Sequence, residues 1–300
     1  MTVGRERIID LDGPLRIVEY GDGRGPLFVC VHGLGGSALD WQVLAPRLAA
    51  RARVVALDLP GFGDTPLGRR TTTVAELQGL LDRFLDRYAA GPVVLVGNSM
   101  GGMVTLLQAT ARPGAVARLV LLAPALPVSA RRLPHPLTTA QFLAYAVRPL
   151  GEWYIRARSR YVDPRTMADA SLGFLTAHPE RVPETIYEQR AALLTRLTAG
   201  ADSERALLSA ARSLLRELAL PAYRHAIRTV STPTLVLHGD SDRLVSVRAA
   251  TAVADQRPDW TVQVLPDVGH VPQLEAAPVV ADAIEAWMQH QHPADFGDVA

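Results

Sequence analysis

The sequence predicts an α/β protein built on a mostly parallel eight-stranded sheet, with helices on both faces and a helical insertion. Two observations support this fold class. Short β-type runs alternate with helical patterns along most of the chain, which is typical of parallel sheets. From about Pro127 to Thr229 the strand-like runs stop, and helix-forming stretches separated by prolines take over. We therefore expect a core formed by residues 1–126 and 230–300, and an inserted helical cap formed by residues 127–229.

The expected elements follow one another in a regular order. The strands are Ile8–Leu11, Leu15–Tyr20, Leu27–His32, Val54–Asp58, Val93–Val96, Leu119–Leu122, Thr234–His238 and Val262–Leu265. The core helices are Leu39–Ala50, Val74–Tyr88, Gly101–Ala111, Val247–Asp255 and Val279–Gln289. Within the insertion, helix-forming stretches include Thr139–Val147, Glu184–Leu197 and Ser203–Leu218.

The position of the insertion suggests a role. Ligands bind at the C-terminal edge of the strands in open α/β sheets, and the insertion follows a sheet strand. We therefore expect it to form a lid over that edge. The alternative is a second helical domain that takes no part in the site.

Composition excludes several classes of partner and of chemistry. A formal charge of +1 gives no long-range field for nucleic acid or acidic membranes, and no apolar stretch reaches transmembrane length. The segment Met1–Gly13 is charged and has no apolar signal core, so we expect a cytoplasmic protein. The chain has no lysine, and all 31 basic residues are arginine, which excludes Schiff-base chemistry, pyridoxal phosphate attachment and a P-loop. The single cysteine, Cys30, is expected to be a buried strand residue; a reactive thiol is the alternative.

The segment Gly97-Asn98-Ser99-Met100-Gly101 is the most informative feature for function. It lies between an apolar run and a helix-like stretch. A serine flanked by glycines at a strand-to-helix junction presents a nucleophile on a sharp, strained turn. The glycines are needed because a side chain there would collide with the neighbouring strand and helix. The segment predicts a hydrolytic enzyme with Ser99 as nucleophile.

A serine hydroxyl needs a base, which is itself oriented by a carboxylate. The expected chain order is serine, then acid, then histidine, and Asp242 and His270 supply it, each beyond the end of a predicted strand. All three residues should therefore lie on one rim of the sheet. Asp240 is the rival for the carboxylate. We favour Asp242, because a residue further into the loop can reach His270, whereas Asp240 is suited to bonding its own backbone in a turn.

Two backbone amides are expected to bind the oxyanion: that of Met100, which follows the nucleophile, and that of Leu34. Leu34 belongs to the glycine-rich loop His32-Gly33-Leu34-Gly35-Gly36, where Gly33 lets the backbone approach the substrate. We expect His32 to hold this loop by hydrogen bonds rather than to act as a second base.

Several other residues suit a structural role as well as a functional one. Phe62 lies in the Pro- and Gly-rich segment Asp58–Asp64, which predicts a tight turn, and is expected to line the site wall. Phe142 and Trp153 of the insertion are expected to line an acyl pocket, with packing inside the insertion as the alternative. Glu275 is expected to be a structural anion for the loop or helix start near His270. No pair of histidines in the insertion has metal-ligand spacing.

At this point the chain resembles the α/β-hydrolase superfamily, in particular its lidded serine hydrolases, which include small esterases, lipases and C–C bond hydrolases. The matching segments are His32-Gly33-Leu34-Gly35-Gly36, Asp58-Leu59-Pro60-Gly61-Phe62-Gly63, Gly97-Asn98-Ser99-Met100-Gly101-Gly102, Gly239-Asp240-Ser241-Asp242 and Gly269-His270. The resemblance implies an α/β-hydrolase fold. It also implies Ser99 as nucleophile, His270 as general base and acid, and Asp242 as the orienting carboxylate, with Leu34 and Met100 forming the oxyanion hole. Haloalkane dehalogenases and epoxide hydrolases of this superfamily carry an aspartate where this chain has Ser99.

Two differences from one subgroup of this superfamily limit the reactions that we expect. The segment Asn98–Gly102 looks like that of enzymes that cleave meta-ring-fission products. Those enzymes tend to have an aromatic residue where this chain has Gln273-Leu274, and a Gly-Pro-Gly pattern that the loop His32–Gly36 lacks. We therefore expect a small-molecule carboxylic ester, lactone or thioester of apolar acyl character, cleaved through an acyl-Ser99 intermediate without metal or organic cofactor. The alternatives are a C–C bond hydrolase and a non-catalytic ligand-binding member of the fold.

Overall fold

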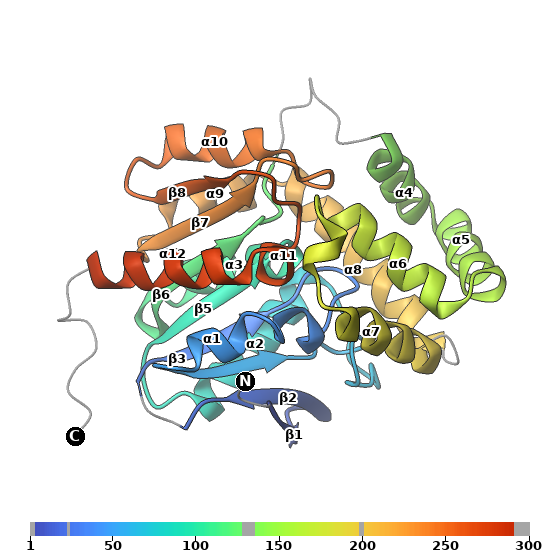
Figure 1. The fold of residues 1–300 in the computed structure, drawn as a ribbon, viewed down its shortest axis with the longest axis horizontal. Helices are drawn as coiled ribbons and strands as arrows, with labels where there is room; N and C mark the ends of the chain where they lie inside the picture. Colours follow the sequence, from blue (N-terminus) through green and yellow to red (C-terminus); the bar gives the residue numbers. More distant parts are fainter. Residues whose placement is uncertain (1–3, 23–24, 128–135, 198–200, 291–300) are drawn as a thin grey trace.

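The computed structural model describes residues 4–22, 25–127, 136–197 and 201–290. Its centre is an eight-stranded sheet in the order β1-β2-β4-β3-β5-β6-β7-β8 (Figure 1). The antiparallel pairs are β1–β2 and β2–β4, and the other five pairs are parallel. The strands are β1 (Arg5–Asp10), β2 (Pro14–Tyr20), β3 (Leu27–Val31), β4 (Arg53–Leu57), β5 (Val93–Asn98), β6 (Val116–Leu122), β7 (Thr234–Gly239) and β8 (Thr261–Leu265). The predicted fold class is confirmed.

Helices cover both faces of the sheet. One face carries α2 (Val74–Tyr88), α3 (Met100–Ala111), α9 (Pro221–Thr229) and α10 (Val247–Gln256). The other carries the short α1 (Ala45–Leu48) and α12 (Ala277–His290). Two single turns, η2 (Pro113–Ala115) and α11 (Pro272–Glu275), lie before β6 and before α12.

The central strand β5 shows why its sequence reads as an unbroken apolar run. Val93 and Leu95 pack into the core on the α2 and α3 face, whereas Val94 and Val96 pack into the core on the α12 face. Successive side chains of a strand point to opposite faces. A strand that is covered on both faces therefore needs apolar residues at every position. Cys30 of β3 is fully buried, as expected.

The predicted helix Leu39–Ala50 is wrong as a single element. The chain instead forms a 3₁₀ turn, η1 (Ala38–Trp41), followed by α1. Pro46 has no amide hydrogen for the carbonyl of Gln42, and its ring conflicts with a preceding helical turn. The proline therefore falls in the first turn of a new helix, where it is tolerated. Strand β1 also begins three residues earlier than expected, at Arg5, because it pairs with β2 along its whole length.

The insertion between β6 and β7 is helical in its described part. Besides α9, it contains α4 (Pro136–Ala146), α5 (Arg148–Tyr161), α6 (Pro164–Leu175), η3 (Pro179–Arg181), α7 (Glu184–Leu197) and α8 (Ala201–Ala219). Figure 1 shows α4 to α8 gathered at one end of the sheet. Helix α8 is tied back to the core, because Thr72 Oγ1 donates to Ala206 O at 2.7 Å and the Val74 amide donates to Ser213 Oγ at 2.9 Å. None of the helices in the described ranges combines the length and apolarity needed to cross a membrane.

Candidate active site

Ser99 lies on a strained turn between β5 and α3. Its backbone has φ 54° and ψ −116°, a conformation that residues other than glycine rarely adopt. The strain is held in place by hydrogen bonds on both sides: the Ser99 amide donates to Leu122 O at 3.1 Å, and Ser99 O accepts from the Ala125 amide at 3.0 Å. Strain of this kind persists only where surrounding structure fixes it, and it concentrates at functional sites.

The two glycines beside this turn allow backbone to approach backbone. A Cβ at Gly101 would lie 2.1 Å from Val31 O and 2.6 Å from His32 O. A Cβ at Gly97 would lie 2.4 Å from Thr105 Oγ1 and 2.5 Å from Gly101 O. Neighbouring backbone atoms cannot move aside as a flexible side chain can. Any larger residue at either position would therefore collide with its neighbours, as the sequence predicted.

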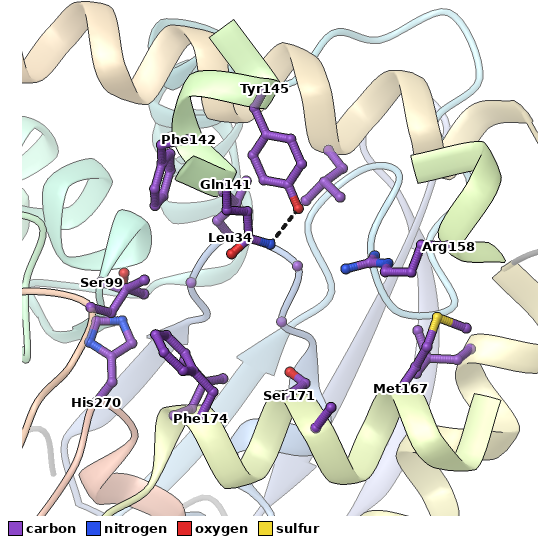
Figure 2. A pocket seen from close by; sticks show the side chains of 18 of the residues that line it. Leu34, Ser99, Gln141, Phe142, Tyr145, Arg158, Met167, Ser171, Phe174 and His270 are labelled. Carbon is purple, nitrogen blue, oxygen red and sulfur yellow. Dashed lines mark hydrogen bonds between the residues drawn. The ribbon is translucent and has the colours of Figure 1, made fainter. Parts of the chain in front are cut away.

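His270 and Asp242 meet at the same rim of the sheet. His270 Nδ1 and Asp242 Oδ2 are 2.7 Å apart, and both side chains are buried. His270 Nε2 is also buried and has no hydrogen-bond partner among the described residues. Figure 2 shows the His270 ring beside Ser99 at the wall of a cavity. The imidazole therefore has one nitrogen bound to a carboxylate and the other free, next to a serine hydroxyl.

Asp242 is held by four donors. The amides of Leu244 and Val245 donate to Oδ1 at 2.7 and 2.9 Å, and Oδ2 is shared by His270 and by His238 Nε2 at 3.2 Å. Burial by itself would raise the pKa of this carboxyl. The charge of His270 and the hydrogen bonds from His238 and His270 outweigh burial and hold the pKa of Asp242 well below its ordinary value.

His238 is a residue that sequence reasoning missed. It lies in β7, is fully buried, and its Nε2 also contacts Val245 O at 2.9 Å. Both contacts of Nε2 are to acceptors, so this nitrogen carries a proton. The available signal was a histidine four residues before Asp242, in an otherwise apolar strand.

Asp240 does not reach His270. Its Oδ1 accepts from the Ser241 hydroxyl at 2.9 Å and from the Asp267 amide at 3.0 Å. It therefore joins the two loops that follow β7 and β8, rather than bonding its own backbone as the turn reading proposed. Asp242, two residues further on, is the carboxylate that the structure brings to the imidazole.

The glycine-rich loop after β3 is held by His32. Its Nε2 accepts from the Leu59 amide at 3.1 Å, so Nδ1 carries the proton and donates to Gly33 O at 2.7 Å. Complete burial lowers the pKa of His32 and keeps the ring neutral. Within the described part of the chain, the amides of Leu34 and Met100 make no hydrogen bond. Met100 is the first residue of α3, where an amide has no partner inside the helix.

The loop that carries His270 is fixed partly by the insertion. The His270 amide donates to Leu175 O, at the end of α6, at 2.6 Å. Glu275 accepts from the Gly269 amide at 2.7 Å and from the His178 amide at 2.6 Å. Glu275 is therefore a structural anion, as expected, and it joins the insertion to the core. Asn98, at the end of β5, also holds this loop from the core, because its Nδ2 donates to His270 O at 3.1 Å.

A cavity of about 680 Å³ lies between the strand ends and the insertion. Gly33, Leu34, Ser99 and His270 line it from the core, and Phe142 and Trp153 line it from the insertion. Trp153 is 65% exposed, so only part of its side chain faces the cavity. Phe62 is not among the lining residues. It packs edge-on against the His32 ring, with centroids 5.6 Å apart, and borders a smaller cavity of about 110 Å³.

The arrangement contains the parts that acyl transfer requires. Ser99 can attack a carbonyl carbon, His270 Nε2 is free to accept the hydroxyl proton, and Asp242 can stabilise the resulting imidazolium. Free amides at Leu34 and Met100 can donate to a developing oxyanion. Among the described residues, no group of three or more His, Cys, Asp or Glu side chains is placed to hold a metal ion.

Comparison with known proteins places the chain among related sequences. It is 31% identical to the dihydrolipoyllysine-residue acetyltransferase component of the acetoin cleaving system of Pseudomonas putida, over 92% of this chain and 66% of that protein. The chain thus spans slightly less than two thirds of that relative's length. It is also 31% identical to a pimeloyl-[acyl-carrier protein] methyl ester esterase of Stenotrophomonas maltophilia, over 92% of this chain and 97% of that protein.

The fold has close counterparts among solved structures. The structure of Cfl2 from Burkholderia cenocepacia matches with a TM-score of 0.81 at 24% identity, covering 95% of this chain and 96% of that one. At that identity the likeness concerns the fold alone. The sequence model of the alpha/beta hydrolase family matches residues 28–283. With a match over most of its length, the chain belongs to the alpha/beta hydrolase family, a family of hydrolytic enzymes.

Proposed function

We propose that this protein is a serine hydrolase that cleaves a carboxylic ester of apolar acyl character through an acyl-Ser99 intermediate. Lactones and thioesters belong to the same class of acyl transfer. The observation that carries the proposal is the strained Ser99 at the wall of a cavity, beside a buried His270 that is bonded to Asp242. Relatives named as esterases support ester hydrolysis as the class of reaction but do not identify the substrate.

In this mechanism the hydroxyl of Ser99 attacks the ester carbonyl carbon while His270 Nε2 accepts its proton. Asp242 keeps the imidazole in the tautomer that leaves Nε2 free and stabilises its charged form. The Leu34 and Met100 amides donate to the oxyanion. His270 then protonates the leaving alcohol, and a water molecule activated by His270 releases the acid from Ser99.

The insertion serves as a lid in this proposal. Phe142, Trp153 and other side chains of α4, α5 and α6 form the wall of the cavity that faces the strand ends. This wall is mainly apolar, which suits an acyl chain. We assign residues 127–229 to the lid and residues 1–126 and 230–300 to the hydrolase core.

The test combines a covalent probe with turnover. Purified protein is treated with a fluorophosphonate, the modified residue is mapped by mass spectrometry, and a series of p-nitrophenyl esters of increasing chain length is assayed. We expect labelling at Ser99 and loss of labelling and turnover in Ser99→Ala. Ser159→Ala is the matched control, because Ser159 borders the smaller cavity away from His270 and should leave both readouts intact.

The other outcomes separate the alternatives. Ser99 labelling with turnover of a vinylogous diketone far above that of esters would select C–C bond hydrolysis. Labelling without turnover of either substrate would select a ligand-binding member of the fold. A protein that is not labelled at Ser99 would show that the serine is not activated, and the proposed mechanism would have to be withdrawn.

A further inference from the structure

The wall of the cavity carries several polar side chains besides those of the proposed mechanism. Most of its lining is apolar, but Gln141, Tyr145, Arg158 and Ser171 all contribute to its wall. Figure 2 shows Arg158 across the cavity from Ser99 and His270, with its guanidinium group directed inward. A few polar groups that converge in an otherwise apolar pocket fix the orientation of a ligand. They are of interest here because the proposed mechanism uses none of them.

Arg158 is a cation without an anionic partner among the described residues. Its Nε is buried without a hydrogen-bond partner, and no ion pair of Arg158 is found among the described residues. The neighbouring arginines differ: Arg190 pairs with Asp40 at 3.4 Å, and Arg156 pairs with Glu204 at 3.1 Å. Burying part of a charged group without a partner is unfavourable. Arg158 thus lacks the anionic partner that each of these neighbours has.

Tyr145 provides a second donor beside this cation. Its side chain is buried and its hydroxyl oxygen accepts from Gln141 Nε2 at 2.7 Å, which leaves the O–H free to donate. Burial raises the pKa of Tyr145 even though the positive charge of Arg158 and the side-chain hydrogen bonds from Gln141 and Arg158 oppose the shift, so the phenol stays protonated.

We propose that Arg158 and Tyr145 form a carboxylate subsite, and that the ester substrate carries a second, ionised carboxyl group at its far end. The inference rests on the proposed function, because it takes Ser99 as the reacting end. One arginine matches a group with a single negative charge. A carboxylate presents two oxygens to the guanidinium fork and a lone pair to the Tyr145 hydroxyl, and the apolar walls between accommodate the methylene chain.

The test compares esters that differ only in the terminal charge. Mono-p-nitrophenyl esters of dicarboxylic acids, from glutarate to suberate, are assayed beside the same compounds with the free carboxyl capped as a methyl ester. We expect Arg158→Met to reduce kcat/KM for the charged series about 10- to 100-fold, mainly through KM, which corresponds to about 1.4–2.8 kcal/mol. The capped series should be unchanged, and Arg158→Lys should recover part of the loss. Arg160→Met is the control, since Arg160 is exposed on the same helix.

A second arm places the carboxylate on the leaving group, as in the hexanoate ester of 4-hydroxybenzoate. An Arg158-dependent preference in either arm supports the subsite and shows which part of the ester carries the charge. A loss in Arg158→Met that is equal for charged and capped esters, or no loss at all, would overturn it while leaving ester hydrolysis intact.

A binding measurement keeps the subsite testable if Ser99 proves inactive. Monomethyl adipate and monomethyl suberate are titrated by calorimetry into Ser99→Ala and into the double variant with Arg158→Met. We expect weaker binding in the double variant. Equal affinities in the two proteins would refute the subsite, independently of any turnover.

Discussion

Replacing Glu275 by glutamine tests whether the insertion helps to position His270. The carboxylate is 5% exposed and accepts two short hydrogen bonds from backbone amides, one on either side of the boundary between core and insertion. Glutamine has the same shape but only one acceptor oxygen. Its amide group must therefore face one of the two N–H groups, which is left without an acceptor in a buried position.

The magnitude follows from these contacts. A hydrogen bond to a charged group contributes about 1.5–3 kcal/mol, and an unsatisfied buried donor costs about 1–3 kcal/mol. Because the remaining bond also loses its charge, we expect Glu275→Gln to lower the free energy of unfolding by about 2–5 kcal/mol. For a chain of this length, about 3 kcal/mol lowers Tm by roughly 5 °C. We expect the variant to stay folded at 25 °C, because native domains are typically stable by about 5–15 kcal/mol, so activity can be measured.

The stability of the variant and its kinetics are both measured. Urea and thermal unfolding give the loss of stability, and p-nitrophenyl ester turnover gives kcat and KM at 25 °C. We expect kcat to fall, because the Gly269 amide that Glu275 holds directly precedes His270. Glu285→Gln is the control, since Glu285 pairs with Arg51 at the surface. An unfolding free energy within about 0.5 kcal/mol of the parent, the range of ordinary surface substitutions, would refute the packing argument. A clear loss of stability with unchanged kcat would refute the positioning role.

The remaining predictions concern the Asp242 carboxylate and the Ser99 turn. Asp242→Asn should lower kcat by about 10⁴-fold with little change in KM, because the imidazole loses its orienting acceptor. Since folding lowers the pKa of Asp242, its contribution to stability is complete above the unfolded value of about 3.9 and is lost as pH falls through the lower folded value. The stability difference between parent and Asp242→Asn, measured by urea unfolding, should therefore narrow below about pH 4, and a constant difference would contradict this account. His238→Leu should reduce kcat/KM about 10- to 100-fold, with His238→Gln recovering part of it; equal values for the two variants would rule out a role for the Nε2–H donor. Gly101→Ala should destabilise the protein by about 3 kcal/mol or more and abolish Ser99 labelling, whereas Gly114→Ala, with no atom near its Cβ, should do neither in thermal unfolding and probe assays.

Local sequence was sufficient for much of the fold. The apolar strand runs, the glycines around Ser99 and the helix periodicities each depend on neighbouring residues, so they could be read along the chain. The prediction of one continuous helix over Leu39–Ala50 failed, because Pro46 lies in the first turn of a new helix, α1, after the turn η1. It also missed the start of β1, because Arg5 is placed by pairing with β2 rather than by its own hydrophobicity.

The candidate catalytic residues could also be predicted from patterns along the chain. Ser99, Asp242 and His270 each follow a strand, and parallel strands end at one edge, so topology alone brings them to one rim. That His270 Nδ1 lies 2.7 Å from Asp242, and not near Asp240, was decided by the paths of two loops. The prediction for Phe62 shows the limit, since it packs on His32 instead of lining the main cavity.

The sequence by itself determined the class of reaction that we expect, because the turn around Ser99 is formed by a serine and glycines that are adjacent in the chain. Only the tertiary structure decided which groups surround the cavity. Arg158 reaches the cavity from α5, Glu275 binds the amide of His178, and Leu175 O fixes the His270 backbone across 95 residues of chain. Such contacts depend on how helices of the insertion pack against the core, and packing between distant segments leaves no pattern in the residues of either one alone.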